Sequence, residues 1–113
     1  MSELWAKVAA LSDLPKGKSM TVGAHGYAVA LFNVDGEICA TQDACPHEGV
    51  SLGMGGCLNG EIISCGYHHW DFNIKTGVSE DGFEDALWVF PVKVSDGVIY
   101  VGLPDGLTPA ALD

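Results

Sequence analysis

The chain has 113 residues, of which 48% are hydrophobic, and its fifteen acidic and five basic residues give a formal net charge of −10. This length predicts a single domain with its own core, and the negative charge argues against nucleic acid or an anionic membrane as a partner. No apolar run approaches the roughly twenty residues of a membrane span and the N-terminus does not resemble a signal peptide, so we expect a cytoplasmic protein.

The first part of the chain is predicted to form β-strands joined by turns. Pro15 and Gly17 mark a turn over residues 12–18, and Asp35-Gly36 is a strong signal for a two-residue hairpin. The aliphatic and aromatic composition of residues 27–34 favours a strand that is buried on one or both faces. Four strands are expected here, over residues 4–9, 19–24, 27–34 and 37–42.

The second part is also predicted to be β-structure. The expected elements are a short strand over residues 61–64, a hairpin over 70–78, and a hairpin that pairs 87–94 with 98–101 around Asp96-Gly97. No segment has ten residues of helical periodicity. Strand patterns place Trp5, Trp88 and Phe90 in the core.

Four cysteines occur in the chain. Cys39 falls in a predicted strand and is expected to be a small buried side chain, whereas Cys57 follows Gly55-Gly56 in a predicted loop. We expect two free thiols here, although a pairing between them remains an alternative. The other two cysteines belong to a ligand motif.

That motif consists of Cys45-Pro46-His47 and, seventeen residues later, Cys65-Gly66-Tyr67-His68. A Rieske [2Fe–2S] cluster takes two cysteines on one iron and two histidines on the other, so each of two loops can deliver one ligand of each kind. We therefore predict that Cys45, His47, Cys65 and His68 bind one [2Fe–2S] cluster. His69 is the alternative to His68, and His25 is expected in a solvated turn.

A tetrahedral zinc site is the alternative use of two cysteines and two histidines. Structural zinc sites usually pair like ligands at short spacing, as in C-x2-4-C and H-x3-5-H, whereas each short element here is mixed. The mixed order favours the iron–sulfur cluster over a zinc-binding structural module.

Through C-x-H-x17-C-x2-H the chain resembles the Rieske ferredoxin family, and the similarity extends over roughly residues 3–102. The resemblance implies an all-β fold, an antiparallel β-sandwich with a small inserted cluster-binding subdomain. It implies a Rieske domain over residues 1–102, with the subdomain at about 43–72 and a C-terminal tail at 103–113. It also implies an electron carrier that is not itself an enzyme.

Departures from respiratory-chain Rieske proteins indicate a soluble ferredoxin of low potential. The positions that match their extra loop cysteines are Val50 and Tyr67, so the disulfide of those proteins cannot form. The positions that match their serine and tyrosine hydroxyls are Trp70 and Phe72. Without those hydrogen bonds the reduced cluster is less stabilised, and we expect a potential near the low end of the Rieske range, at about −150 mV.

Among ferredoxins, the chain looks most like the Rieske component of multicomponent di-iron monooxygenases such as toluene 4-monooxygenase. The similarity lies in the second loop, the Thr76-Gly77 turn and the C-terminal tail. The predicted partners are therefore a flavin-containing NAD(P)H reductase and the hydroxylase component of an aromatic or alkene monooxygenase. The alternatives are the ferredoxin of an aromatic-ring-hydroxylating dioxygenase and the small subunit of a nitrite reductase. Small subunits of nitrite reductases often lack the cluster ligands, so the intact motif argues against that last alternative.

Overall fold

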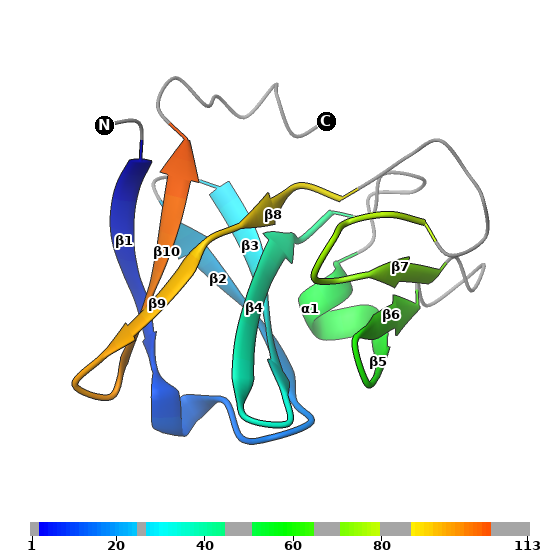
Figure 1. Cartoon of the computed structure of the whole chain (residues 1–113), viewed down its shortest axis with the longest axis horizontal. Helices are drawn as coiled ribbons and strands as arrows, with labels where there is room; N and C mark the ends of the chain where they lie inside the picture. The colour runs from blue at the N-terminus through cyan, green and yellow to red at the C-terminus, as the bar shows by residue number, and fades with distance from the viewer. Residues whose placement is uncertain (1–2, 25–26, 45–50, 65–70, 80–86, 105–113) are drawn as a thin grey trace.

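The structure is a computed structural model that describes residues 3–24, 27–44, 51–64, 71–79 and 87–104. These residues form three antiparallel sheets (Figure 1). The first sheet has the order β1-β10-β9, the second β2-β3-β4-β8 and the third β5-β6-β7. The strands are β1 (Glu3–Ala10), β2 (Ser19–Ala24), β3 (Tyr27–Val34), β4 (Glu37–Gln42), β5 (Cys57–Asn59), β6 (Ile62–Ser64), β7 (Asp71–Asn73), β8 (Val89–Phe90), β9 (Val92–Ser95) and β10 (Val98–Pro104).

Two Asp-Gly turns close the hairpins that the sequence predicted. Asp35 and Gly36 have φ values of 56° and 102°, and Asp96 and Gly97 have values of 52° and 74°. Positive φ at both central residues is the type I′ geometry, whose twist matches that of the flanking strands. The predicted bounds of β2, β3 and β4 are confirmed to the residue.

The core lies on both faces of the second sheet, because side chains alternate along β3. Val29 and Leu31 pack with Ile99 and Val101 in the cluster that faces the first sheet. Ala30 and Phe32 belong to a second cluster that contains buried side chains of α1 (Leu52–Gly55), β6 and β7. The expected all-β sandwich is confirmed, and its second sheet also supports the small third sheet.

Residues 87–94 do not form the one strand that was expected. Pro91 separates β8, where Phe90 pairs with Ala40 of the second sheet, from β9, where Val92 pairs with Val101 of the first sheet. Proline has no N–H for a sheet ladder, so the chain changes sheets there. The carbonyl of Pro91 still accepts a hydrogen bond of 2.9 Å from the N–H of Gly102.

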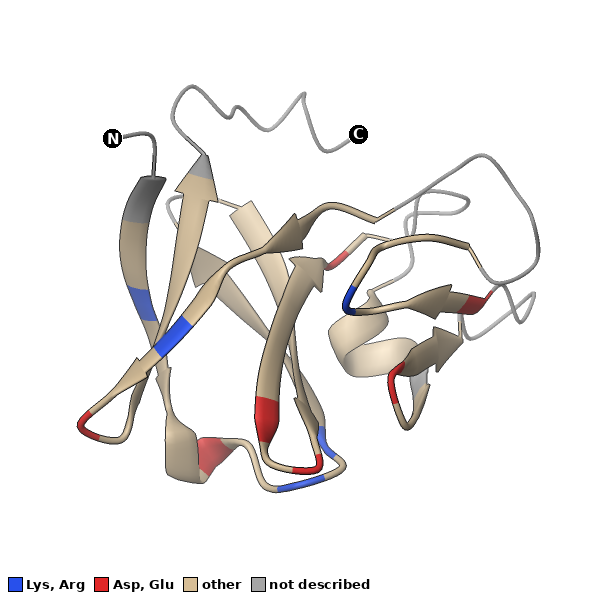
Figure 2. Ribbon diagram, viewed as in Figure 1, with Lys and Arg blue, Asp and Glu red and all other residues tan. Residues whose placement is uncertain are grey.

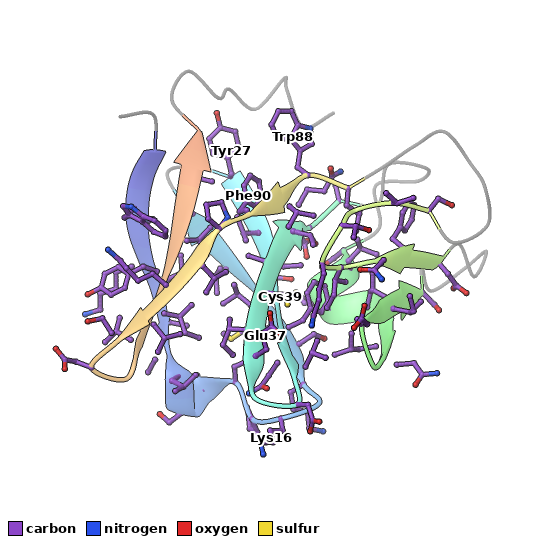
Figure 3. All side chains as sticks on the ribbon, viewed as in Figure 1. Lys16, Tyr27, Glu37, Cys39, Trp88 and Phe90 are labelled. Carbon is purple, nitrogen blue, oxygen red and sulfur yellow. The ribbon has the colours of Figure 1, made fainter. Side chains whose placement is uncertain are left out.

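Three other expectations need correction. Trp5 and Trp88 are 40% and 41% exposed, so only Phe90 of the three predicted core aromatics is buried. Trp88 and Phe90 are labelled in Figure 3. Cys57 begins β5 and does not lie in a loop. The helix α1 was not expected, because a four-residue helix is too short to show a helical period.

A 3-10 turn, η1 (Leu11–Asp13), follows β1 and begins one residue before the turn expected over residues 12–18. In the described part of the chain, no helix has the length and apolarity that crossing a membrane requires.

Candidate metal centre

The four predicted ligands, Cys45, His47, Cys65 and His68, lie in two segments outside the described residues, 45–50 and 65–70. The alternative ligand His69 lies in the second of these segments, and His25 also falls outside the described residues. The structure does describe the residues at which each ligand segment begins and ends. We call these residues the roots of the first and second ligand loops.

The root of the first loop joins the end of β4 to the start of α1. Ala44 and Ser51 form an antiparallel bridge, and the N–H of Leu52 donates a 2.7 Å hydrogen bond to the carbonyl of Asp43. The chain therefore leaves and returns at adjacent points. The intervening segment, 45–50, begins with Cys45.

The root of the second loop joins β6 to β7. Ser64 and Asp71 are register partners in the third sheet, and the Ser64 hydroxyl donates a 2.5 Å hydrogen bond to Oδ1 of Asp71. This segment also has six residues and begins with a cysteine, Cys65. Both cysteines thus follow directly from a residue that is fixed by backbone pairing.

One buried cluster supports both roots. Leu52 follows the first root in sequence, while Ile63 and Phe72 flank the second, and all three side chains are fully buried in the cluster under the third sheet. A Cβ added at Gly56 would lie 2.9 Å from Cδ1 of Ile63, which shows how closely α1 and β6 approach. This hydrophobic cluster therefore fixes the position of one root relative to the other.

A third segment is tied to the first root by Gln42, whose side chain is 3% exposed. The N–H of Trp88 donates to Gln42 Oε1 at 2.8 Å, and Gln42 Nε2 donates to the carbonyl of Ala44 at 2.7 Å. Gln42 therefore connects the residue before Cys45 to the end of the 79–87 segment. That segment is closed by a 2.8 Å hydrogen bond from the N–H of Leu87 to the carbonyl of Gly77.

Buried polar residues at the first root were not predicted as site residues. Asp43 is 6% exposed, and its Oδ1 accepts hydrogen bonds from the Thr21 hydroxyl at 2.8 Å and the Gly53 N–H at 2.9 Å. The sequence offers one signal for them: Gln42, the last residue of β4, and Asp43 are consecutive polar residues shortly before Cys45.

The charge around the roots is acidic. Between residues 19 and 74 the chain has six acidic residues and no lysine or arginine. The five lysines lie on β1 and β9, in the turn before β2 and after β7 (Figure 2). Lys75 Nζ lies 2.8 Å from Glu37 Oε1 and 3.8 Å from Glu61 Oε2, and the hydrogen bond to Glu37 raises the pKa of Lys75.

The donor set fits a Rieske cluster. Each six-residue segment contains one cysteine at its start and at least one histidine, which matches in number and kind the two cysteines and two histidines that such a cluster takes. Among the described residues no group of three or more histidine, cysteine, aspartate or glutamate side chains is placed to hold a metal ion.

Comparison with known proteins identifies the family. The Rieske [2Fe-2S] domain family matches residues 4–91. The chain is 36% identical over 91 residues to the biphenyl dioxygenase ferredoxin subunit of Pseudomonas sp. strain KKS102, covering 80% of this chain and 84% of that protein. It is 38% identical over 104 residues to the naphthalene 1,2-dioxygenase ferredoxin component of Pseudomonas aeruginosa, covering 91% of this chain and 99% of that protein.

A solved structure agrees with these relatives. A chain from the complex of reduced oxygenase and oxidized ferredoxin in carbazole 1,9a-dioxygenase superposes with a TM-score of 0.81 at 35% identity, covering 92% of this chain and 97% of that one. The family implies one Rieske-type [2Fe–2S] cluster and not the zinc ion of the alternative reading. The chain belongs to the Rieske [2Fe–2S] family and is a ferredoxin, an electron carrier and not a catalyst.

Proposed function

We propose that this chain carries single electrons from a flavin-containing NAD(P)H reductase to the terminal oxygenase of an aromatic-ring-hydroxylating dioxygenase. The observation that carries the proposal is the similarity, at 36% and 38% identity over most of the chain, to ferredoxin components of two such dioxygenases. These relatives favour the dioxygenase over the di-iron monooxygenase that the sequence motifs suggested.

Within this proposal Cys45 and Cys65 bind one iron, and His47 and His68 bind the other. The cluster accepts and releases one electron at a time, and the neutral imidazoles raise its potential above that of clusters with four thiolates. We assign the cluster-binding subdomain to about residues 43–72 within a domain of residues 1–102, with 103–113 as a tail.

The protein's own contribution is to hold the two ligand loops at fixed positions. Backbone pairing at Ala44–Ser51 and Ser64–Asp71 fixes both roots, and the buried cluster around Leu52, Ile63 and Phe72 joins them. A rigid ligand frame suits an electron carrier, because little of the protein then has to rearrange when the cluster charge changes.

A coupled assay tests the assignment. NADH, a flavoprotein reductase and this ferredoxin are combined with either a naphthalene dioxygenase oxygenase or a toluene di-iron hydroxylase. The proposal predicts cis-dihydrodiol formation that rises with ferredoxin concentration in the first mixture. Product in the di-iron mixture alone would restore the monooxygenase assignment.

A further inference from the structure

Asp43 stands out because a buried carboxylate lies at the root of the first ligand loop, two residues before Cys45. Its side chain is 6% exposed, and no ion pair to it occurs among the described residues. Burying such a group is costly unless hydrogen bonds replace its hydration. Two hydrogen bonds do so here, and both come from other elements.

The first partner is the hydroxyl of Thr21 in β2, which lies 2.8 Å from Asp43 Oδ1. Thr21 is the donor in this hydrogen bond, so its single hydroxyl proton points toward Asp43. Thr21 Oγ1 also lies 3.1 Å from Ser51 Oγ, so the Ser51 hydroxyl is the donor in that contact.

Ser51 in turn accepts a 3.2 Å hydrogen bond from the N–H of Met54, which caps α1. The donors therefore run in one direction, from Met54 through Ser51 and Thr21 to the Asp43 carboxylate. Hydrogen bonds in such a chain polarise and strengthen one another. The chain connects the residues that precede the first ligand loop with those that follow it.

The second partner of Asp43 Oδ1 is the N–H of Gly53, at 2.9 Å. A Cβ at Gly53 would lie 2.4 Å from Thr21 Oγ1 and 2.7 Å from the carbonyl oxygen of Met20. Only glycine lets α1 approach β2 this closely. The carboxylate thus holds both ends of the loop on the edge of the second sheet.

We propose that Asp43 is a positioning residue for the cluster: its carboxylate fastens both ends of the first ligand loop to Thr21 and Gly53 and thereby sets the positions of Cys45 and His47. The proposal rests on the ligand assignment of the proposed function. The carboxylate touches residues of the loop root and acts on the cluster through them.

The test compares Asp43→Ala with Asp43→Asn in the cluster-loaded protein. Alanine leaves the Thr21 hydroxyl and the Gly53 N–H without their acceptor, whereas asparagine retains an oxygen at that position. We expect Asp43→Ala to shorten the half-life of the cluster in the presence of a chelator about tenfold, equivalent to about 1.4 kcal/mol. Its EPR signal and reduction potential should also change, and Asp43→Asn should restore the lifetime and the EPR line shape toward those of the unmodified protein.

Two further variants keep the test decisive if Asp43→Ala fails to fold. Thr21→Val removes one donor with little change of shape and should shift the same signals in the same direction, while Thr21→Ser should not. Asp13→Ala serves as the control, because Asp13 is an exposed carboxylate in η1 that accepts a 3.3 Å hydrogen bond from the N–H of Ala10.

The possible failures are distinguishable. An unmodified protein without a [2Fe–2S] cluster would overturn the proposed function itself. A loaded Asp43→Ala protein whose melting temperature falls but whose EPR signal, potential and cluster half-life are unchanged would show a purely structural role. That second result would overturn the inference and leave the carrier role intact.

Discussion

Gln42 and Trp88 exchange two hydrogen bonds, one through the backbone and one through a side chain. The N–H of Gln42 donates to the carbonyl of Trp88 at 2.9 Å, and the N–H of Trp88 donates to Oε1 of Gln42 at 2.8 Å. The Gln42 amide also donates to the carbonyl of Ala44, directly before Cys45. One buried side chain therefore links the first ligand loop to the strand that follows the 79–87 segment.

Replacing Gln42 by leucine should destabilise the protein, because the N–H of Trp88 and the carbonyl of Ala44 would lose their hydrogen-bond partner in a partly buried place. A loss of about 2 kcal/mol is expected for these groups. For a chain of this size that loss corresponds to a fall in melting temperature of about 8 °C. Circular dichroism at a fixed heating rate measures the shift, and Asn59→Ala, at an exposed position, is the control. A Gln42→Leu protein with the same melting temperature as the control would refute the prediction.

Gly77 closes the 79–87 segment in a conformation that other residues avoid. Its φ is +81°, and an added Cβ would lie 2.3 Å from the carbonyl oxygen of Leu87. Gly77→Ala should cost about 3 kcal/mol, the sum of left-handed strain and a backbone clash, and lower the melting temperature by about 12 °C.

Gly97→Ala is the matched control for this prediction. Gly97 has a φ of +74° but no heavy atom within 4 Å of the added Cβ. Strain alone, about 1 kcal/mol, should lower its melting temperature by about 4 °C. Equal shifts in the two variants would show that the contact with Leu87 costs nothing.

Local signals explain which parts of the fold were predictable. The bounds of β2, β3 and β4 follow from apolar runs flanked by Pro15, Gly17 and Asp35-Gly36, all of which act within a few residues. Trp88 was misplaced in the core because a strand pattern does not reveal that β8 is a two-residue edge strand. Only pairing with β4 defines that edge.

The candidate site also has a part that the sequence predicts and a part that it does not. The ligand spacing can be read directly from the sequence, because each cysteine and histidine pair falls within four residues. The contact between Thr21 and Asp43 joins residues 22 positions apart, and the helix α1 depends on the fit of Gly53 against Thr21. Such support is defined by tertiary packing and has no local pattern.

Cys39 should react slowly with alkylating reagents in the folded protein. Burial, followed by the nearby negative charge of Glu37, raises the pKa of this thiol and keeps it in the unreactive protonated form. Peptide mapping after iodoacetamide treatment at about pH 8 should show labelling of Cys39 only after unfolding. Rapid labelling in the folded state would contradict the burial.

The same pKa shift predicts a pH dependence of stability. The folded thiol binds its proton more tightly than the unfolded thiol, so its contribution is full at low pH and is lost as the pH rises above the ordinary thiol value. The stability difference between the unmodified protein and Cys39→Ala should therefore narrow from about pH 7 to about pH 10. Urea unfolding across this range measures it, and a difference that widens would have the wrong sign.

Phe72→Tyr tests the expectation that the [2Fe–2S] cluster has a low reduction potential. The ring of Phe72 is fully buried among Ile63, Leu52 and their neighbours, so a new hydroxyl must find an acceptor inside the protein. If the acceptor is cluster sulfur, the hydrogen bond favours the electron-rich reduced state and should raise the potential by roughly 60–130 mV. Voltammetry measures the shift; an unchanged potential with lower stability would place the hydroxyl in the apolar core, away from the cluster.

The EPR spectrum of the reduced protein tests whether Cys45, His47, Cys65 and His68 hold a Rieske [2Fe–2S] cluster. The purified protein should contain two iron and two acid-labile sulfide per chain and give a Rieske-type signal on reduction. His68→Ala should abolish or transform that signal while His69→Ala keeps it. A colourless zinc protein, or a signal lost in His69→Ala but kept in His68→Ala, would contradict the assignment.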